Sequence, residues 1–399
     1  MPSTSCDQIA REILEASIAG RPPAALPRAL VEDPSGQALF GILVEGLADR
    51  FEPALGDIYA RLFSQAVARV APGVDAASLV ARYERVRRPR PIAGEPRRVL
   101  VLSRVTLGAD VAVTSVLMAA AQQRFPDAEV VFVGPHKNFE LFAADARLGH
   151  APIAYQRGGL AQRLAVWEEL KALAAAPDSV VIDPDSRLTQ LGLLPVGAED
   201  RYHLFESRAY GAATSCALPE LASAWAVETF GVPGMKPYVA LAGVRQPSPG
   251  IAVSLGVGKN PSKRVPDPFE ERLLRLLAAG GLPMTIDRGA GGEEAQRVER
   301  AVERSGTRPA MWDGSFAGFA AIIAASTLYV GYDSAGGHVA AACGVPLISI
   351  FAGHPVPRMF DRWRPVGERA AVIRVDQPAP LEVLARVQQA VAALAHAAL

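Results

Sequence analysis

Residues 329–342 contain the side chains best suited to holding an anion. An apolar run ends at an aspartate, two glycines and a histidine follow, and an alanine-rich helix is expected after them. Glycines allow a backbone to approach a ligand closely, and the first amides of a helix attract negative charge. The pattern predicts either a diphosphate cradle or a glycine-rich turn that only saves space. The candidate contacts are Asp333, Ser334, Gly336, Gly337 and His338.

Two other turns after expected strands carry charged side chains. Residues 254–264 contain Lys263, which could neutralise a phosphate, but they lack the spacing of a P-loop. Residues 103–111 lack the GxGxxG pattern of nicotinamide dinucleotide sites. Asp110 in this turn is expected either to cap a helix or to take a proton from a hydroxyl group.

A third acidic segment allows three interpretations. Asp183 and Asp185 follow an apolar run and form a DxD pair, whose two carboxylates could hold a divalent ion. With Arg187, the same residues could instead line the acceptor side of a cleft. They could also form only a polar strand end.

The elements that position these residues alternate between strands and helices. Apolar runs at 99–102, 129–134 and 180–183, and again at 251–255, 283–287, 327–330 and 347–351, are separated by helical patterns. This alternation predicts an α/β protein with two Rossmann-like, doubly wound domains facing a cleft, with ligands beyond the carboxyl ends of the strands. An extra N-terminal all-helical region precedes them. The expected parts are a helical module at 1–90, a first Rossmann-like domain at 97–235, a second at 236–378 and a C-terminal helix at 379–399.

Composition excludes several classes of protein. Among 399 residues, 41 Lys and Arg balance 41 Asp and Glu, so the chain lacks the cationic excess of a nucleic-acid binder. Its three cysteines form no CxxC pair, which disfavours a disulfide framework or a structural zinc site. The first residues carry no signal-peptide pattern, and glycine and polar residues interrupt the most apolar stretch. We therefore expect a cytoplasmic protein without an integral membrane segment.

Four blocks between about residues 97 and 376 resemble glycosyltransferase family 9, the heptosyltransferase-like enzymes with the GT-B fold. The first block is RVLVLSR at 98–104 with LGADV at 107–111 and RFPDAE at 124–129, and the second is KRVP at 263–266. The third is VGYD at 330–333 with His338 and GVP at 344–346. The fourth is IFAGHP at 350–355 with WRP at 363–365. The family usually has Gly-Asp in its first block, whereas Ala109 separates Gly108 from Asp110 here.

The resemblance implies an inverting, metal-independent glycosyl transfer from a nucleotide-diphosphate sugar, typically ADP-heptose. Lys263 and the turn from Asp333 to His338 would contact the donor, and Glu293 or Glu294 would contact its nucleoside. Asp110 would be the general base toward an acceptor hydroxyl, which could belong to a glycan, a protein or a small molecule. The resemblance makes 97–235 the acceptor-side domain and 236–378 the nucleotide-sugar domain, and it implies no separate cofactor and no metal.

Two alternatives have the same architecture. A sugar-nucleotide epimerase would need no acceptor, and a sugar-nucleotide-binding scaffold would have lost catalysis. In either case the helical region at 1–90 is expected to serve packing, protein contact or oligomerisation.

Overall fold

The computed structural model describes residues 5–243, 250–258, 260–289 and 291–396. Close contacts divide the chain into two units, which are described separately. The first comprises Met1–Thr106, Val116–Phe139 and Ala146–Met235, and the second comprises Leu107–Ser115, Glu140–Asp145 and Lys236–Leu399. The helical region thus lies in one unit with the first sheet, and the short segment that contains Asp110 lies in the second unit.

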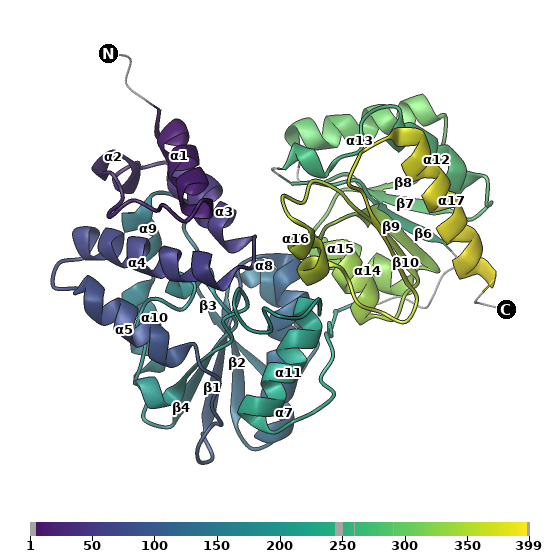
Figure 1. The fold of residues 1–399 in the computed structure, drawn as a ribbon. Helices are drawn as coiled ribbons and strands as arrows, with labels where there is room; N and C mark the ends of the chain where they lie inside the picture. The colour runs from purple at the N-terminus through teal and green to yellow at the C-terminus, as the bar shows by residue number, and fades with distance from the viewer. Residues whose placement is uncertain (1–4, 244–249, 259, 290, 397–399) are drawn as a thin grey trace. The chain divides into compact units, whose positions relative to one another are not determined.

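The N-terminal region is helical, as its periodicity predicts (Figure 1). Ser5 and Asp75 cap their helices by accepting hydrogen bonds from the amides of Gln8 and Ser78. Pro53 is the first residue of the helix that extends to Val70. The elements are α1 (Cys6–Ile18), α2 (Arg28–Val31), the π-helix η1 (Gln37–Val44), α3 (Glu45–Ala48), α4 (Pro53–Val70) and α5 (Ala76–Val86).

The first sheet has the strand order β3-β2-β1-β4-β5, with every neighbouring pair parallel. Its strands are β1 (Arg98–Leu102), β2 (Glu129–Gly134), β3 (Leu148–Pro152), β4 (Ser179–Asp183) and β5 (Tyr202–Leu204). Its connections contain α6 (Leu107–Ala109), the π-helix η2 (Asp110–Thr114), α7 (Ser115–Arg124), α8 (His136–Phe139), α9 (Leu160–Leu164), α10 (Trp167–Ala174), the 3-10 helices η3 (Arg187–Thr189) and η4 (Glu199–Arg201), and α11 (Leu218–Phe230). The inner strands are buried on both faces, which explains their unbroken apolar runs.

The second sheet has the order β11-β10-β9-β6-β7-β8 and is also parallel throughout. Its strands are β6 (Ile251–Ser254), β7 (Met284–Asp287), β8 (Ala310–Trp312), β9 (Leu328–Tyr332), β10 (Leu347–Phe351) and β11 (Ala370–Arg374). Its helices are η5 (Pro261–Lys263), α12 (Phe269–Ala278), α13 (Gly292–Ser305), α14 (Phe316–Ala325), α15 (Ala335–Ala342), α16 (Pro357–Trp363) and α17 (Pro380–His396). Part of the expected C-terminal helix, residues 397–399, lies outside the described residues.

The arginine-rich stretch at 82–98 is partly built into the fold. Arg82 is only 5% exposed and belongs to α5, which extends to Val86. Its guanidinium lies over the ring of Tyr202, with its Cζ 4.5 Å from the ring centroid. The stretch is therefore partly a structural element of the first unit.

No helix within the described ranges combines the length and the apolar character that a membrane crossing requires.

Candidate functional site

Lys263 and Asp333 meet at the carboxyl ends of the central strands of the second sheet. Lys263 ends the short helix η5 after β6, and Asp333 directly follows β9. The Lys263 Nζ lies 2.5 Å from Asp333 Oδ2 and 3.5 Å from the Asp333 carbonyl oxygen. An ammonium group has three donors, so this pairing leaves capacity for a further acceptor. These two residues lie 70 positions apart in the sequence and were both expected to contact the sugar donor. In the structure they contact each other directly.

The turn after Asp333 presents the N-terminus of α15. Ser334 is the N-cap residue, but its side chain forms no hydrogen bond with the first-turn amides. Its hydroxyl lies 3.3 Å from that of Tyr329 instead. The first turn of α15 therefore lacks a side-chain cap, beside a lysine, and such an arrangement favours an anion.

Gly336 and Gly337 are required by packing inside the protein. A Cβ atom at Gly336 would lie 2.3 Å from the hydroxyl oxygen of Tyr329, and one at Gly337 would lie 3.1 Å from Cγ of Pro365. The space-saving interpretation accounts for both positions. Tyr329, which was not among the candidate residues from the sequence, therefore packs against this turn.

We expect Gly336→Ala to lower the free energy of unfolding by about 1–3 kcal/mol, because the methyl group overlaps the Tyr329 side chain. Gly197→Ala is the matched control, since its Cβ would lie 3.6 Å from Cβ of Ala174, an ordinary contact. Urea unfolding of both variants measures the difference. Equal stabilities would contradict the packing role.

His338 is buried in α15, with 5% of its surface exposed, and its ring lies edge to face with Trp363. Burial lowers the pKa of His338 to about 4; the Asp333 carboxylate opposes this shift and the Lys263 ammonium adds to it. The imidazole is therefore neutral at neutral pH. It adds no positive charge to that of Lys263.

This lowered pKa predicts a pH-dependent stability. The unfolded chain binds a proton at His338 near pH 6.5, whereas the folded protein binds it only near pH 4, so the free energy of unfolding falls as the pH drops between these values. One such group contributes a slope of about 1.4 kcal/mol per pH unit. We expect His338→Gln to lose that slope in urea unfolding between pH 4.5 and 6. Parallel curves for variant and wild type would contradict the neutral, buried state.

Asp110 lies in the π-helix η2, in the same unit as α15. Its carboxylate is fully buried and accepts a hydrogen bond of 2.7 Å from the Thr114 hydroxyl. Asp110 is not an N-cap, because the helix has already begun at Leu107. The preceding turn packs against α15, since a Cβ at Gly108 would lie 3.2 Å from Cα of Ala335 and 3.3 Å from Cδ2 of His338. Residues 107–111 of the first block are thus neighbours of the third block within the second unit.

The two glutamates of α13 have different environments. Glu293 is exposed in the first turn of the helix. The carboxylate of Glu294 instead accepts hydrogen bonds from the amides of Val257 (3.0 Å) and Gly258 (3.1 Å). Glu294 thereby joins the loop after β6 to α13, so it is the glutamate attached to the loop that leads to Lys263.

Arg187 and the two aspartates before it belong to the first unit. Asp183 accepts hydrogen bonds from the Ser186 amide and from the hydroxyl groups of Thr189 and Tyr202. Asp185 accepts one from Ser207 and pairs with Arg208 at 3.1 Å. These bonds favour a structural role for the two carboxylates over metal binding. Arg187 pairs with Glu45 of α3 at 2.9 Å. Within the described ranges, no group of three or more His, Cys, Asp or Glu side chains is arranged to hold a metal ion.

Comparison with known protein families assigns the segment that holds Lys263 and Asp333. Residues 262–389 match the model of glycosyltransferase family 9 (heptosyltransferase). This part of the chain is similar to glycosyltransferase family 9. The match agrees with the resemblance of the second, third and fourth blocks and supports the glycosyltransferase class, and the first block, at 98–129, lies outside it.

Solved structures of heptosyltransferases share the GT-B fold with this chain. E. coli heptosyltransferase WaaC with ADP is 20% identical, with a TM-score of 0.59 over 74% of this chain and 99% of that one. The same enzyme with ADP-2-deoxy-2-fluoro heptose is 19% identical, with a TM-score of 0.57 over 74% of this chain and 98% of that one. E. coli ADP-heptose LPS heptosyltransferase II is 19% identical, with a TM-score of 0.53 over 74% of this chain and 98% of that one. These likenesses confirm the expected α/β fold of two Rossmann-like parts. No curated protein sequence matches the chain.

Proposed function

We propose that this family 9 glycosyltransferase transfers a sugar, heptose or a related one, from a nucleotide-diphosphate sugar to an acceptor hydroxyl with inversion and without a metal. The observation that supports this most is the Lys263–Asp333 pair beside the uncapped first turn of α15. Similar structures contain ADP or an ADP-heptose analogue. We propose a cytoplasmic location as well.

In the proposed reaction, the acceptor oxygen attacks the anomeric carbon and the bond from that carbon to the diphosphate oxygen breaks. Asp110 takes the acceptor proton, and the departing diphosphate keeps the bonding electron pair. Lys263 and the first amides of α15 stabilise its negative charge, in place of a divalent ion. Asp333 holds the lysine in position.

The remaining candidate residues are proposed to contact substrate. Ser334 would contact the donor through its hydroxyl, and the backbone at Gly336 and Gly337 would line the diphosphate. His338 would offer a neutral imidazole. Glu293 and Glu294 both begin α13, and we assign the nucleoside side of the site to this first turn. Arg187 is assigned to the acceptor.

Native mass spectrometry of the full chain tests the donor assignment. We expect one ADP-heptose per chain, with equal occupancy in EDTA, and no occupancy by UDP-N-acetylglucosamine. Heptose-free lipopolysaccharide is the acceptor probe, because a similar structure is that of an LPS heptosyltransferase. Inversion is read from the anomeric configuration of the product by NMR. Absence of ADP-heptose binding overturns the proposal, and a changed sugar nucleotide formed without acceptor indicates an epimerase.

A further inference from the structure

The segment at 186–194 has a backbone that needs external support. It follows β4 and contains Arg187, the residue assigned to the acceptor. Asp185, Gln190 and Leu191 have left-handed backbones, with φ values of 68°, 52° and 58°. Such conformations in residues other than glycine persist where the surroundings impose them, and they cluster at functional sites.

Two side chains of the N-terminal helices bind this segment directly. The Tyr59 hydroxyl of α4 donates a hydrogen bond of 2.8 Å to the carbonyl oxygen of Gln190. The Arg82 Nη1 of α5 donates to the carbonyl oxygen of Gly192 at 3.0 Å. These carbonyls are buried, so each requires a partner inside the protein.

A buried arginine adds a third connection. Arg208 is 3% exposed and donates hydrogen bonds to the Leu191 carbonyl at 3.0 Å and to the Tyr83 hydroxyl of α5 at 3.2 Å. It also pairs with Asp185 and Glu206. The loops after β4 and β5 are thus bound to α5 through one side chain.

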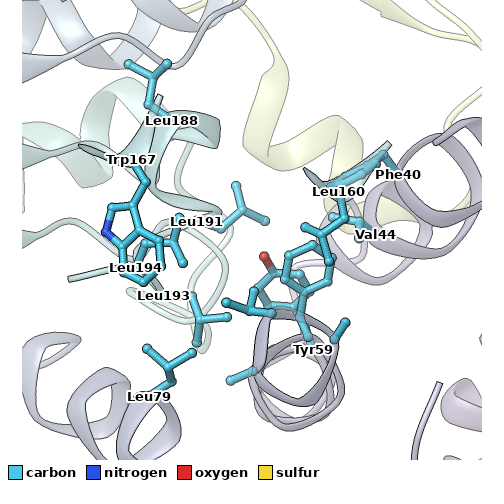
Figure 2. Close-up of a cluster of buried hydrophobic side chains, with 14 of the residues drawn as sticks. Phe40, Val44, Tyr59, Leu79, Leu160, Trp167, Leu188, Leu191, Leu193 and Leu194 are labelled. Atoms are coloured by element: carbon cyan, nitrogen blue, oxygen red, sulfur yellow. The ribbon is translucent and has the colours of Figure 1, made fainter. Parts of the chain in front are cut away.

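Apolar packing joins the same parts. Figure 2 shows Leu191, Leu193 and Leu194 gathered between Tyr59 and Trp167, and all five belong to one buried cluster. Phe40 and Val44 of η1 belong to it as well. The helical region therefore shares its core with the segment, and a solvent layer does not separate them.

The supported segment places Arg187 against the helical region. Its guanidinium pairs with Glu45, and 36% of the arginine side chain remains exposed. In parallel α/β sheets, ligands bind beyond the carboxyl ends of the strands, which is where this segment lies in the first sheet.

We propose that Tyr59 and Arg82 are positioning residues that hold the backbone of residues 186–194 and, through it, Arg187 in the orientation that the acceptor requires. The N-terminal helices then form a part of the acceptor side of the enzyme. This inference rests on the proposed glycosyl transfer and extends it to a region with no separate role so far.

The test uses Tyr59→Phe and Arg82→Met in the full chain. We expect amide hydrogen exchange in peptides covering 186–194 to rise at least tenfold, and the rate of phenylglyoxal labelling at Arg187 to change at least threefold. With heptose-free lipopolysaccharide, the acceptor KM should rise at least tenfold, whereas the KM and Kd for ADP-heptose change less than twofold. Arg82→Lys should restore part of the acceptor KM, because it keeps one donor.

Arg69→Met is the matched control. Arg69 donates to the Leu26 carbonyl at 3.1 Å, so the same chemistry is removed wholly within the helical region. Equal effects in Arg69→Met, or faster exchange without a change at Arg187 or in the acceptor KM, would overturn the inference. If wild type does not bind ADP-heptose, the proposed function fails, and labelling at Arg187 still decides whether Tyr59 and Arg82 position it.

Discussion

Asp110→Asn is expected to lower the turnover number at least 100-fold while the Kd for ADP-heptose changes less than twofold. Asparagine keeps the shape of the side chain and can still accept the hydrogen bond from Thr114. Its amide cannot take up the acceptor proton, and loss of a general base commonly lowers the rate about 10²–10⁴-fold. Release of ADP at saturating ADP-heptose and heptose-free lipopolysaccharide measures the turnover, and calorimetry measures the Kd.

Thr114→Val is the control for this prediction. It removes the hydrogen bond to Asp110 but retains the carboxylate, so we expect a loss of less than tenfold. Full activity of Asp110→Asn would remove this residue from the mechanism. An equal loss in both variants would indicate that the helix geometry matters, and not the proton transfer.

Lys263→Ala is expected to raise the Kd for ADP-heptose about 10- to 100-fold. A hydrogen bond that involves a charged group contributes about 1.5–3 kcal/mol, and each 1.4 kcal/mol is a factor of ten in affinity. The variant also leaves the Asp333 carboxylate, which is 8% exposed, without its cation beside the bound diphosphate. Calorimetry with ADP-heptose and with ADP measures the loss.

Lys171→Ala is the matched control, because it removes another lysine–carboxylate pair, that with Glu168 at 2.7 Å, on the surface of the first unit. We expect no change in the Kd there. An unchanged Kd in Lys263→Ala would reject the diphosphate assignment, and thermal unfolding of both variants verifies that they remain folded.

The inner strands were predictable from the sequence and the outer ones were not. Most inner strands are buried along nearly their whole length and are mainly apolar. The exception is β7, whose burial alternates between buried and half-buried positions. The strands missed, β3, β5, β8 and β11, are the edges of the two sheets. Edge strands are shorter or less buried, as in β8 and β11, so their sequences lack that signal.

Contacts within the candidate site depend on tertiary structure to different degrees. The turn after β9 could be located from Asp333 to His338, because its strand, glycines and helix are consecutive. The family resemblance implied that Lys263 and this turn contact the same sugar donor, but the sequence carried no signal for their ion pair or for the support from Tyr329. The sequence did not distinguish Glu293 from Glu294 either, because their difference lies in the tertiary contacts of Glu294 with the amides of Val257 and Gly258.

The π-helix at Asp110–Thr114 has a consequence for residue numbering. A π turn holds one more residue than an α turn, so it can accommodate an extra residue such as Ala109. The side chains of the helix beyond it then keep their orientation. Correspondences with enzymes that have Gly-Asp in this block would therefore shift by one position at this turn. A substitution designed without that shift would alter Ala109 or Val111, both buried apolar residues, and would test packing in place of proton transfer.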